Sequence, residues 1–173
     1  MPSFHLEHDL ECSENTYWDK AFFDDEYNRR LFNEELRFPE WRVVDQKDEG
    51  PRIVRNIRAQ PPVDDVPGPL KAVVGDGAGY AERGIYDRGA HSYEANITPN
   101  RLADRVAVRI VTRTTKLSDT RCRRIVDGTV TAKIFVVGAL LEQRMIADLK
   151  RSFEKSAVLT NRFVAEKGWS LLV

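Results

Sequence analysis

The sequence predicts an α+β domain in which a curved antiparallel sheet of six to seven strands, with two short helices after the first strand, wraps around one long C-terminal helix. Three observations support this fold class. The chain begins with an alternating apolar and polar segment, which is typical of a half-buried strand. Several more alternating segments, separated by turn residues, follow residue 36. Near Val137 the apolar period changes once, from two residues to the roughly 3.6 of a helix.

The size and charge of the chain indicate one ordinary domain. A chain of 173 residues buries about 70% of the surface that its unfolded form exposes, so it can hold a core together with an internal pocket. We therefore expect a single domain over residues 1–173, and we expect a monomer. The 27 basic and 27 acidic residues cancel, and this balance argues against a nucleic-acid partner.

A strand and two short helices are predicted for the first 36 residues. Within segment 3–11, one side of the strand is formed by Phe4, Leu6, His8 and Leu10. Ser13 is placed to cap one short helix, and Asp24 or Asp25 is placed to cap a second.

Six strands are predicted between residues 37 and 134. Segments 37–46 and 52–60 flank the turn KDEGP and predict a hairpin. The proline- and glycine-rich segment 61–80 predicts a long excursion without a long regular element, and its run LKAVV is too short to assign. The remaining strands are predicted over 79–89, 91–98, 105–116 and 119–134. An antiparallel meander is the simplest topology for this order.

The C-terminal segment predicts one amphipathic helix over about residues 137–167. Its apolar face is formed by residues four apart: Leu141, Met145, Leu149 and Phe153. That face is expected to pack on the sheet. The apolar stretch before it does not predict a membrane span, because only eight uncharged residues separate Lys133 from Glu142 and a spanning helix needs about 20.

The last predicted strand and this helix carry a family-like pattern, in which DGTVTAKIFVVG leads into ALLEQRMIADL. The pattern resembles the ending of an uncharacterised bacterial family in the START-like, or helix-grip, superfamily (SRPBCC). The matching residues are Gly128, Val130, Ala132, Lys133, Ile134, Val136, Val137, Gly138, Leu141, Glu142, Met145, Leu149, Thr160, Phe163 and Val164. The segment CSENTYWDKAFFDDEYNRRLF also resembles the usual opening of that superfamily.

The resemblance implies the helix-grip fold, with a cavity between the sheet and the long helix. Members of the superfamily include carriers of lipids and other hydrophobic ligands, polyketide cyclases and related proteins. The segment AQPPVDDVPGPLKAVVGDGAG departs from the family pattern, which usually has an apolar run and fewer glycines there. Since this segment usually lies near the cavity mouth in such folds, the resemblance says least about the ligand at that point.

The chain offers no complete catalytic or metal-binding motif. The GDGAG run of Gly75–Gly79 is followed by a strand pattern, whereas a phosphate loop needs a helix there, so we expect an ordinary loop. His5 and His8 are three residues apart and point to opposite faces of a strand. No serine or cysteine lies in a nucleophile-elbow context. We expect neither a metal nor a cofactor.

The two cysteines, Cys12 and Cys122, are too few for a disulfide framework, and we expect both to be free and buried. The N-terminal segment is acidic and lacks the apolar region of a signal peptide. These observations predict a cytoplasmic protein.

Arginines are concentrated on the last two predicted strands. Arg109 and Arg113 share the outer face of one strand. They are expected to pair with Glu82, Glu94 and Asp127, or to dock on anionic lipid headgroups at a membrane surface. Arg124 differs, because its parity groups it with the apolar residues Cys122, Val126 and Val130. An inward arginine requires a carboxylate or the anionic head of a ligand.

Two functions suit this fold. The first is non-catalytic binding or transport of a hydrophobic small molecule, expected to be a lipid such as a sterol or phospholipid. The alternative is a polyketide cyclase or dehydratase type of enzyme, with His8 or Tyr93 acting together with Arg124. A third class, a protein-interaction module, lacks an exposed apolar stripe in the sequence. The residues predicted to line the cavity are His8, Trp41, Ile57, Tyr86, Tyr93, Val108, Ile110, Arg124, Leu141, Met145, Leu149 and Phe153.

Overall fold

The computed structural model describes residues 2–75 and 78–173. Seven strands form one antiparallel sheet: β1 (Ser3–Leu10), β2 (Glu40–Asp48), β3 (Arg52–Gln60), β4 (Tyr80–Asp87), β5 (Ser92–Pro99), β6 (Val106–Ser118) and β7 (Arg121–Ala132). The helical elements are α1 (Glu14–Thr16), η1 (Tyr17–Phe22), α2 (Asp25–Asn28), η2 (Arg29–Glu35), α3 (Gly68–Val74) and α4 (Gly138–Glu166). The structure confirms the predicted α+β class, with a long helix within one residue of each predicted end.

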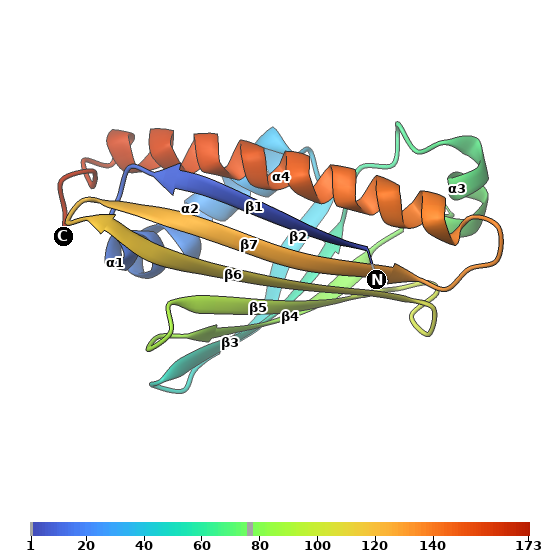
Figure 1. Cartoon of the computed structure of the whole chain (residues 1–173), viewed down its shortest axis with the longest axis horizontal. Coiled ribbons are helices and arrows are strands. Elements are labelled where there is room, and N and C mark those ends of the chain that lie inside the picture. Colours follow the sequence, from blue (N-terminus) through green and yellow to red (C-terminus); the bar gives the residue numbers. More distant parts are fainter. Residues whose placement is uncertain (1, 76–77) are drawn as a thin grey trace.

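The sheet is a meander with one strand added. Its strand order is β1-β7-β6-β5-β4-β3-β2, so β2 to β7 are neighbours in sequence order and β1 closes the far side against β7. In Figure 1 the long helix α4 runs along the sheet on the side of β1 and β7. The β1–β7 register is uninterrupted and pairs His8 with Arg124. No bulge therefore reverses the parity of Arg124.

The helical elements after β1 are short and wound unusually wide. Ser13 and Asp24 cap α1 and α2, each accepting a hydrogen bond from a backbone N–H, as predicted for Ser13 and for one of the two aspartates. Each helix continues into a segment of π-helical turns, η1 and η2. Tyr27 and Leu31 on these elements pack against Leu159 and Phe163 of α4.

In segment 61–80 the structure shows a short helix, α3, around the run LKAVV that sequence analysis left unassigned. Helix α3 includes the run LKAVV and starts beside two prolines, where a missing N–H costs no helical hydrogen bond. Leu70 on α3 is fully buried against Val106, Ala132 and Leu141, so tertiary packing stabilises a helix too short to be recognised by periodicity. Of the predicted GDGAG loop, residues 76–77 lie outside the described part of the chain.

Several arginines on the outer face of the sheet form ion pairs. Arg109 pairs with Glu94 at 2.9 Å, as predicted, while Arg123 pairs with Asp9 at 2.8 Å. Asp127 instead accepts a hydrogen bond from His5 at 2.6 Å. The prediction that Glu82 belongs to this outer network was wrong, because Glu82 lines the interior.

Candidate functional site

A cavity of about 140 Å³ lies between the inner face of the sheet and the helical elements. It is bounded by η1, α2 and η2 on one side, by the inner face of strands β2 to β7, and by the middle of α4. Most of its surface is apolar or aromatic, with Ile57, Ile97, Ile110 and Leu149 among the lining residues. The lining also includes three side chains that bear a formal charge when ionised: Arg55, Glu82 and Arg124.

Arg124 joins β7 to α4 from inside the protein. Its side chain is 1% exposed, which confirms its predicted inward orientation. Nη1 donates to Ser156 Oγ at 2.8 Å, and Nη2 donates to the carbonyl oxygen of Phe153 at 2.8 Å. Tyr17 Oη lies 3.5 Å from Nη1, and His8 Nδ1 lies 3.3 Å from Nη2.

The partners of Arg124 are all uncharged in the described part of the chain. Burial lowers the pKa of His8 below its ordinary value of 6.5, and the Arg124 cation lowers it further. His8 is therefore neutral near neutral pH and offers Nδ1 as an acceptor. The carboxylate partner expected for Arg124 is replaced by a hydroxyl, a phenol, an imidazole and a main-chain carbonyl. Only its Nε lacks a partner among the described residues.

A second polar group lies on strands β3, β4 and β5. Tyr93 Oη donates to Glu82 Oε2 at 2.7 Å and accepts from Arg55 Nε at 3.3 Å. Arg55 is 4% exposed. Burial raises the pKa of Glu82 above its ordinary value of 4.5, and the Arg55 cation opposes this shift. Burial raises the pKa of Tyr93 as well, so this phenol stays protonated.

Gly84 makes room for this group. A Cβ at position 84 would lie 1.7 Å from Tyr93 Oη, so the tyrosine ring crosses the strand where β4 has no side chain. A glycine inside a strand often marks such a close approach. Because Gly84 has no side chain, the Tyr93 hydroxyl has room to lie between Glu82 and Arg55.

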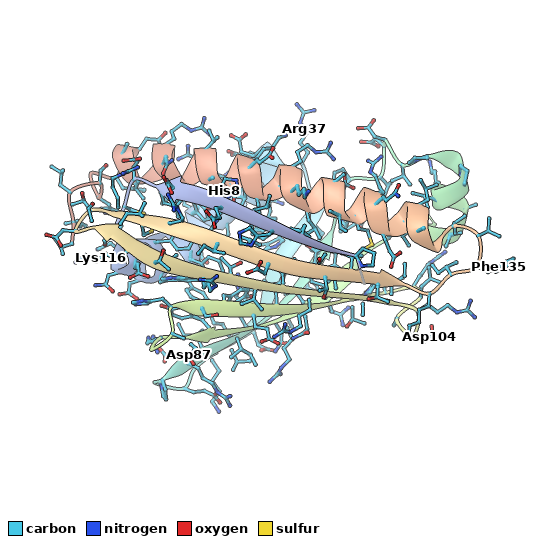
Figure 2. The ribbon with its side chains drawn as sticks, viewed as in Figure 1. His8, Arg37, Asp87, Asp104, Lys116 and Phe135 are labelled. Atoms are coloured by element: carbon cyan, nitrogen blue, oxygen red, sulfur yellow. The ribbon has the colours of Figure 1, made fainter. Side chains whose placement is uncertain are left out.

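The structure brings seven of the predicted cavity residues to the cavity: Trp41, Ile57, Tyr93, Ile110, Arg124, Leu149 and Phe153. His8 lies outside this lining on β1 beside α4 (Figure 2), where it contacts Arg124. Tyr86 is also outside it, because its ring stacks on Trp18 at 4.6 Å between centroids. Val108 belongs to the solid core.

Leu141 and Met145 point toward the sheet but lie too near the start of α4 to reach the cavity. Leu141 is buried in a cluster with Leu70 of α3, and Met145 packs on the same cluster. Their placement follows from α3, which fills the space between this end of α4 and the sheet.

Sequence analysis missed Arg55 and Glu82, although a signal was present. Arg55 shares strand parity with Ile57, and Glu82 shares it with Tyr86, and both apolar residues were predicted to face inward. Glu82 was predicted to lie on the solvent side, and no position was predicted for Arg55. Strand alternation indicates the direction of these two side chains correctly, whereas their charge does not.

The described residues contain no group of three or more His, Cys, Asp or Glu side chains that could hold a metal ion. Within the same residues, no helix is both long and apolar enough to cross a bilayer. Among the described residues, the polar side chains that line the cavity supply two guanidinium groups, one carboxyl group, the Asn28 amide and several hydroxyl groups.

Comparison with solved structures shows the fold. A protein from Thermus thermophilus, TTHA0849, superposes with a TM-score of 0.66 at 14% identity, over 96% of this chain and 99% of that one. The Zhui aromatase/cyclase from Streptomyces sp. R1128 gives 0.58 at 12% identity, over 96% and 93%. A START superfamily protein from Mycobacterium smegmatis gives 0.56 at 10% identity, over 90% and 96%.

These similarities confirm the helix-grip fold that the resemblance to START-like proteins implied. A search of curated proteins with the sequence finds no match. A family model described as "Protein of unknown function (DUF2505)" matches residues 6–164. Because this match covers most of the sequence, the chain belongs to the DUF2505 family of proteins of unknown function.

Proposed function

We propose that the protein binds a hydrophobic small molecule in the cavity between the sheet and α4, without changing it chemically. The observation that carries this proposal is the cavity itself, lined mainly by apolar and aromatic side chains with a few polar groups. Sites for small molecules are generally of this kind, with the polar groups fixing the orientation of the ligand. The START-like fold, which is known for binding hydrophobic ligands, supports the same function.

The volume of the cavity limits the ligand. About 140 Å³ is close to the roughly 150 Å³ that accepts one benzene ring, and well below the 300–1,000 Å³ or so of pockets for drug-sized ligands. We therefore propose a lipid-like molecule with one ring or a short acyl chain inside the cavity. A complete sterol or phospholipid would have to displace lining side chains such as the stacked rings of Phe32 and Trp41.

Native mass spectrometry of protein purified without detergent tests this function. We expect a bound small molecule that leaves on denaturation. Leu149→Trp fills the cavity and should abolish the bound mass, whereas Lys150→Trp, on the exposed side of the same helix, should retain it. Wild-type protein that stays empty after incubation with lipid extract would count against the proposal.

An enzyme of the cyclase or dehydratase type is the second candidate, because Glu82, Tyr93 and Arg55 form a hydrogen-bonded group inside the cavity. Burial raises the pKa of the Glu82 carboxyl group above its ordinary value, and a carboxyl group in such a setting can act as a general acid or base. The expected pairing of Tyr93 with Arg124 is replaced by one with Arg55. Recovery of the bound molecule after prolonged incubation separates the two functions, since a binding protein returns it unchanged and an enzyme returns a product.

We propose that the β7–α4 loop docks on an anionic membrane. The arginines on the outer face of the sheet are less suited to this role, because several of them already form ion pairs. Figure 2 shows Phe135 at the tip of the β7–α4 loop, pointing away from the protein. Phe135 and Val136 are 94% and 82% exposed. Exposed Lys133 adjoins them, and its N–H bonds to the carbonyl oxygen of Arg105, whose side chain is also exposed. Apolar residues beside cations suit an anionic interface.

Co-sedimentation with vesicles tests the docking surface. Phe135→Ser should weaken binding to vesicles that contain phosphatidylserine, while Leu171→Ser, which changes another exposed apolar residue, should not. Equal binding by both variants would reject the loop as the docking surface.

The two free, buried cysteines support a further proposal, that the protein works in a reducing compartment such as the cytoplasm.

A further inference from the structure

Arg55 is a buried cation held mainly by the faces of aromatic rings. Its guanidinium carbon lies 4.9 Å from the ring centroid of Phe22, 5.0 Å from Phe23, 5.2 Å from Tyr93 and 5.7 Å from Trp41. Ring faces attract a cation within about 6 Å, and more strongly where water is excluded. The rings therefore stabilise the charge without using any of its N–H groups.

Most hydrogen-bond donors of Arg55 remain open. A guanidinium has five N–H donors in a planar fork, and in the described residues only the Nε donor has a partner, Tyr93 Oη. Among the described residues the fully buried polar side-chain atom without a partner is Arg124 Nε, so the Nη atoms of Arg55 keep accessible surface. Because Arg55 lines the cavity, its Nη1 and Nη2 groups are available to a molecule bound there.

The charges around the cavity are unequal. Among the described lining residues Arg55 and Arg124 are positive and Glu82 is negative when ionised, which leaves one net positive charge. Arg124 already uses its Nη groups on Ser156 and the Phe153 carbonyl. A buried charge without a counter-charge is costly, so the cavity favours a ligand with one negative charge. The open Nη groups of Arg55 are the donors available to bind that charge.

We infer that the ligand carries a carboxylate, bound by the Nη groups of Arg55, and an apolar body of one ring or a short chain. This inference rests on the proposed binding function and names the ligand class. A carboxylate is planar and matches the guanidinium fork with two parallel hydrogen bonds. Its apolar body would lie against Ile57, Ile110 and Leu149, which also line the cavity.

A neutral ligand is the competing possibility. Glu82 interacts with Arg55 electrostatically, and Tyr93 bridges them, so a hydroxyl or carbonyl group could complete the site if Glu82 alone balanced Arg55. The two possibilities differ in one measurable quantity, the relative affinity for an acid and for the alcohol of the same shape.

Titration calorimetry at neutral pH with a series of phenylalkanoic acids and the matching phenylalkanols measures that quantity. We expect wild-type protein to prefer the acid by about tenfold or more, the effect of a charge-assisted hydrogen bond in a dry site. Arg55→Met keeps the apolar contacts of the side chain and should abolish the preference. Arg55→Lys keeps the charge without the fork and should retain part of it.

The outcomes separate the ligand class from the proposed function. Equal or tighter binding of the alcohols by wild-type protein would overturn the carboxylate and leave the binding function intact. An undiminished acid preference in a folded Arg55→Met variant would overturn the role of Arg55. If no member of either series binds and purified protein carries no small molecule, the binding function is overturned together with the ligand class.

Discussion

Arg124 and Arg55 are both almost completely buried on inward positions of the same sheet, yet their surroundings differ. Arg124 gives its Nη donors to Ser156, the Phe153 carbonyl and other neutral acceptors, and so ties β7 to α4. Arg55 lies among ring faces and keeps its Nη groups open toward the cavity. A buried arginine whose Nη donors are satisfied holds the fold together, whereas one with open Nη donors is suited to binding. Substitutions at Arg124 and around Arg55 should therefore have different effects.

The largest effect is expected from Arg124→Leu. The change removes the buried group that donates to the Phe153 carbonyl and to the Ser156 and Tyr17 hydroxyls, so the free energy of unfolding should fall by about 3 kcal/mol. Urea unfolding measures this loss. Arg123→Leu, on the exposed side of the same strand, is the matched control and should unfold near the wild-type midpoint. Similar midpoints for the two variants would show that the hydrogen bonds from Arg124 to α4 do not stabilise the fold.

Gly84→Ala, which affects the group formed by Arg55, Tyr93 and Glu82, should have the next largest effect on stability. The added Cβ occupies the space of the Tyr93 hydroxyl, so the ring must move away from Glu82 and Arg55. Overpacking of this kind costs roughly 1–3 kcal/mol. Gly68→Ala is the control, because a Cβ there meets nothing within 4 Å. Wild-type stability and wild-type acid preference in Gly84→Ala would show that Tyr93 does not need this space.

The contributions of Glu82 and His8 to the stability of the fold should change with pH in opposite directions. The raised pKa of Glu82 means that the folded state holds a proton more tightly than the unfolded state, so this contribution to stability is present below the ordinary value of 4.5 and is lost as pH rises through the raised value. The lowered pKa of His8, beside Arg124 and Glu154, gives a contribution present above 6.5 and lost as pH falls through the lowered value.

Unfolding midpoints measured across pH for two variants separate these contributions. Glu82→Gln should remove the loss on raising the pH, and His8→Gln should remove the loss on lowering it. A wild-type pH profile in either variant would show that the corresponding group keeps its ordinary pKa in the folded protein.

The smallest effect on stability is expected from Arg55→Met. A methionine can lie among the same rings, and replacing a buried charged group by an apolar one of similar size is often neutral or stabilising. The free energy of unfolding should stay within about 1 kcal/mol of the wild-type value by urea unfolding, even though acid binding is lost. A loss as large as that of Arg124→Leu would show that the two arginines are structural in the same way.

Local periodicity in the sequence determined the elements and their faces. Alternation placed Phe4, Leu10, Val126 and Arg124 inside, and the four-residue repeat from Leu141 to Phe153 placed one side of α4 against the sheet. These inferences hold because side-chain direction follows the strand or helix period wherever one face is covered. Periodicity was insufficient for α3, whose seven residues are stabilised by burial of Leu70.

Only the tertiary structure decided which inward residues meet at a cavity and which fill the core. Tyr86 and Tyr93 are direct partners on β4 and β5, yet Trp18 of η1 covers the first while Gly84 lets the second reach Glu82. The partners of Arg124 come from β1, η1 and α4. Strand parity states only which face a residue occupies. What covers that face depends on elements distant in sequence, and so it follows from packing.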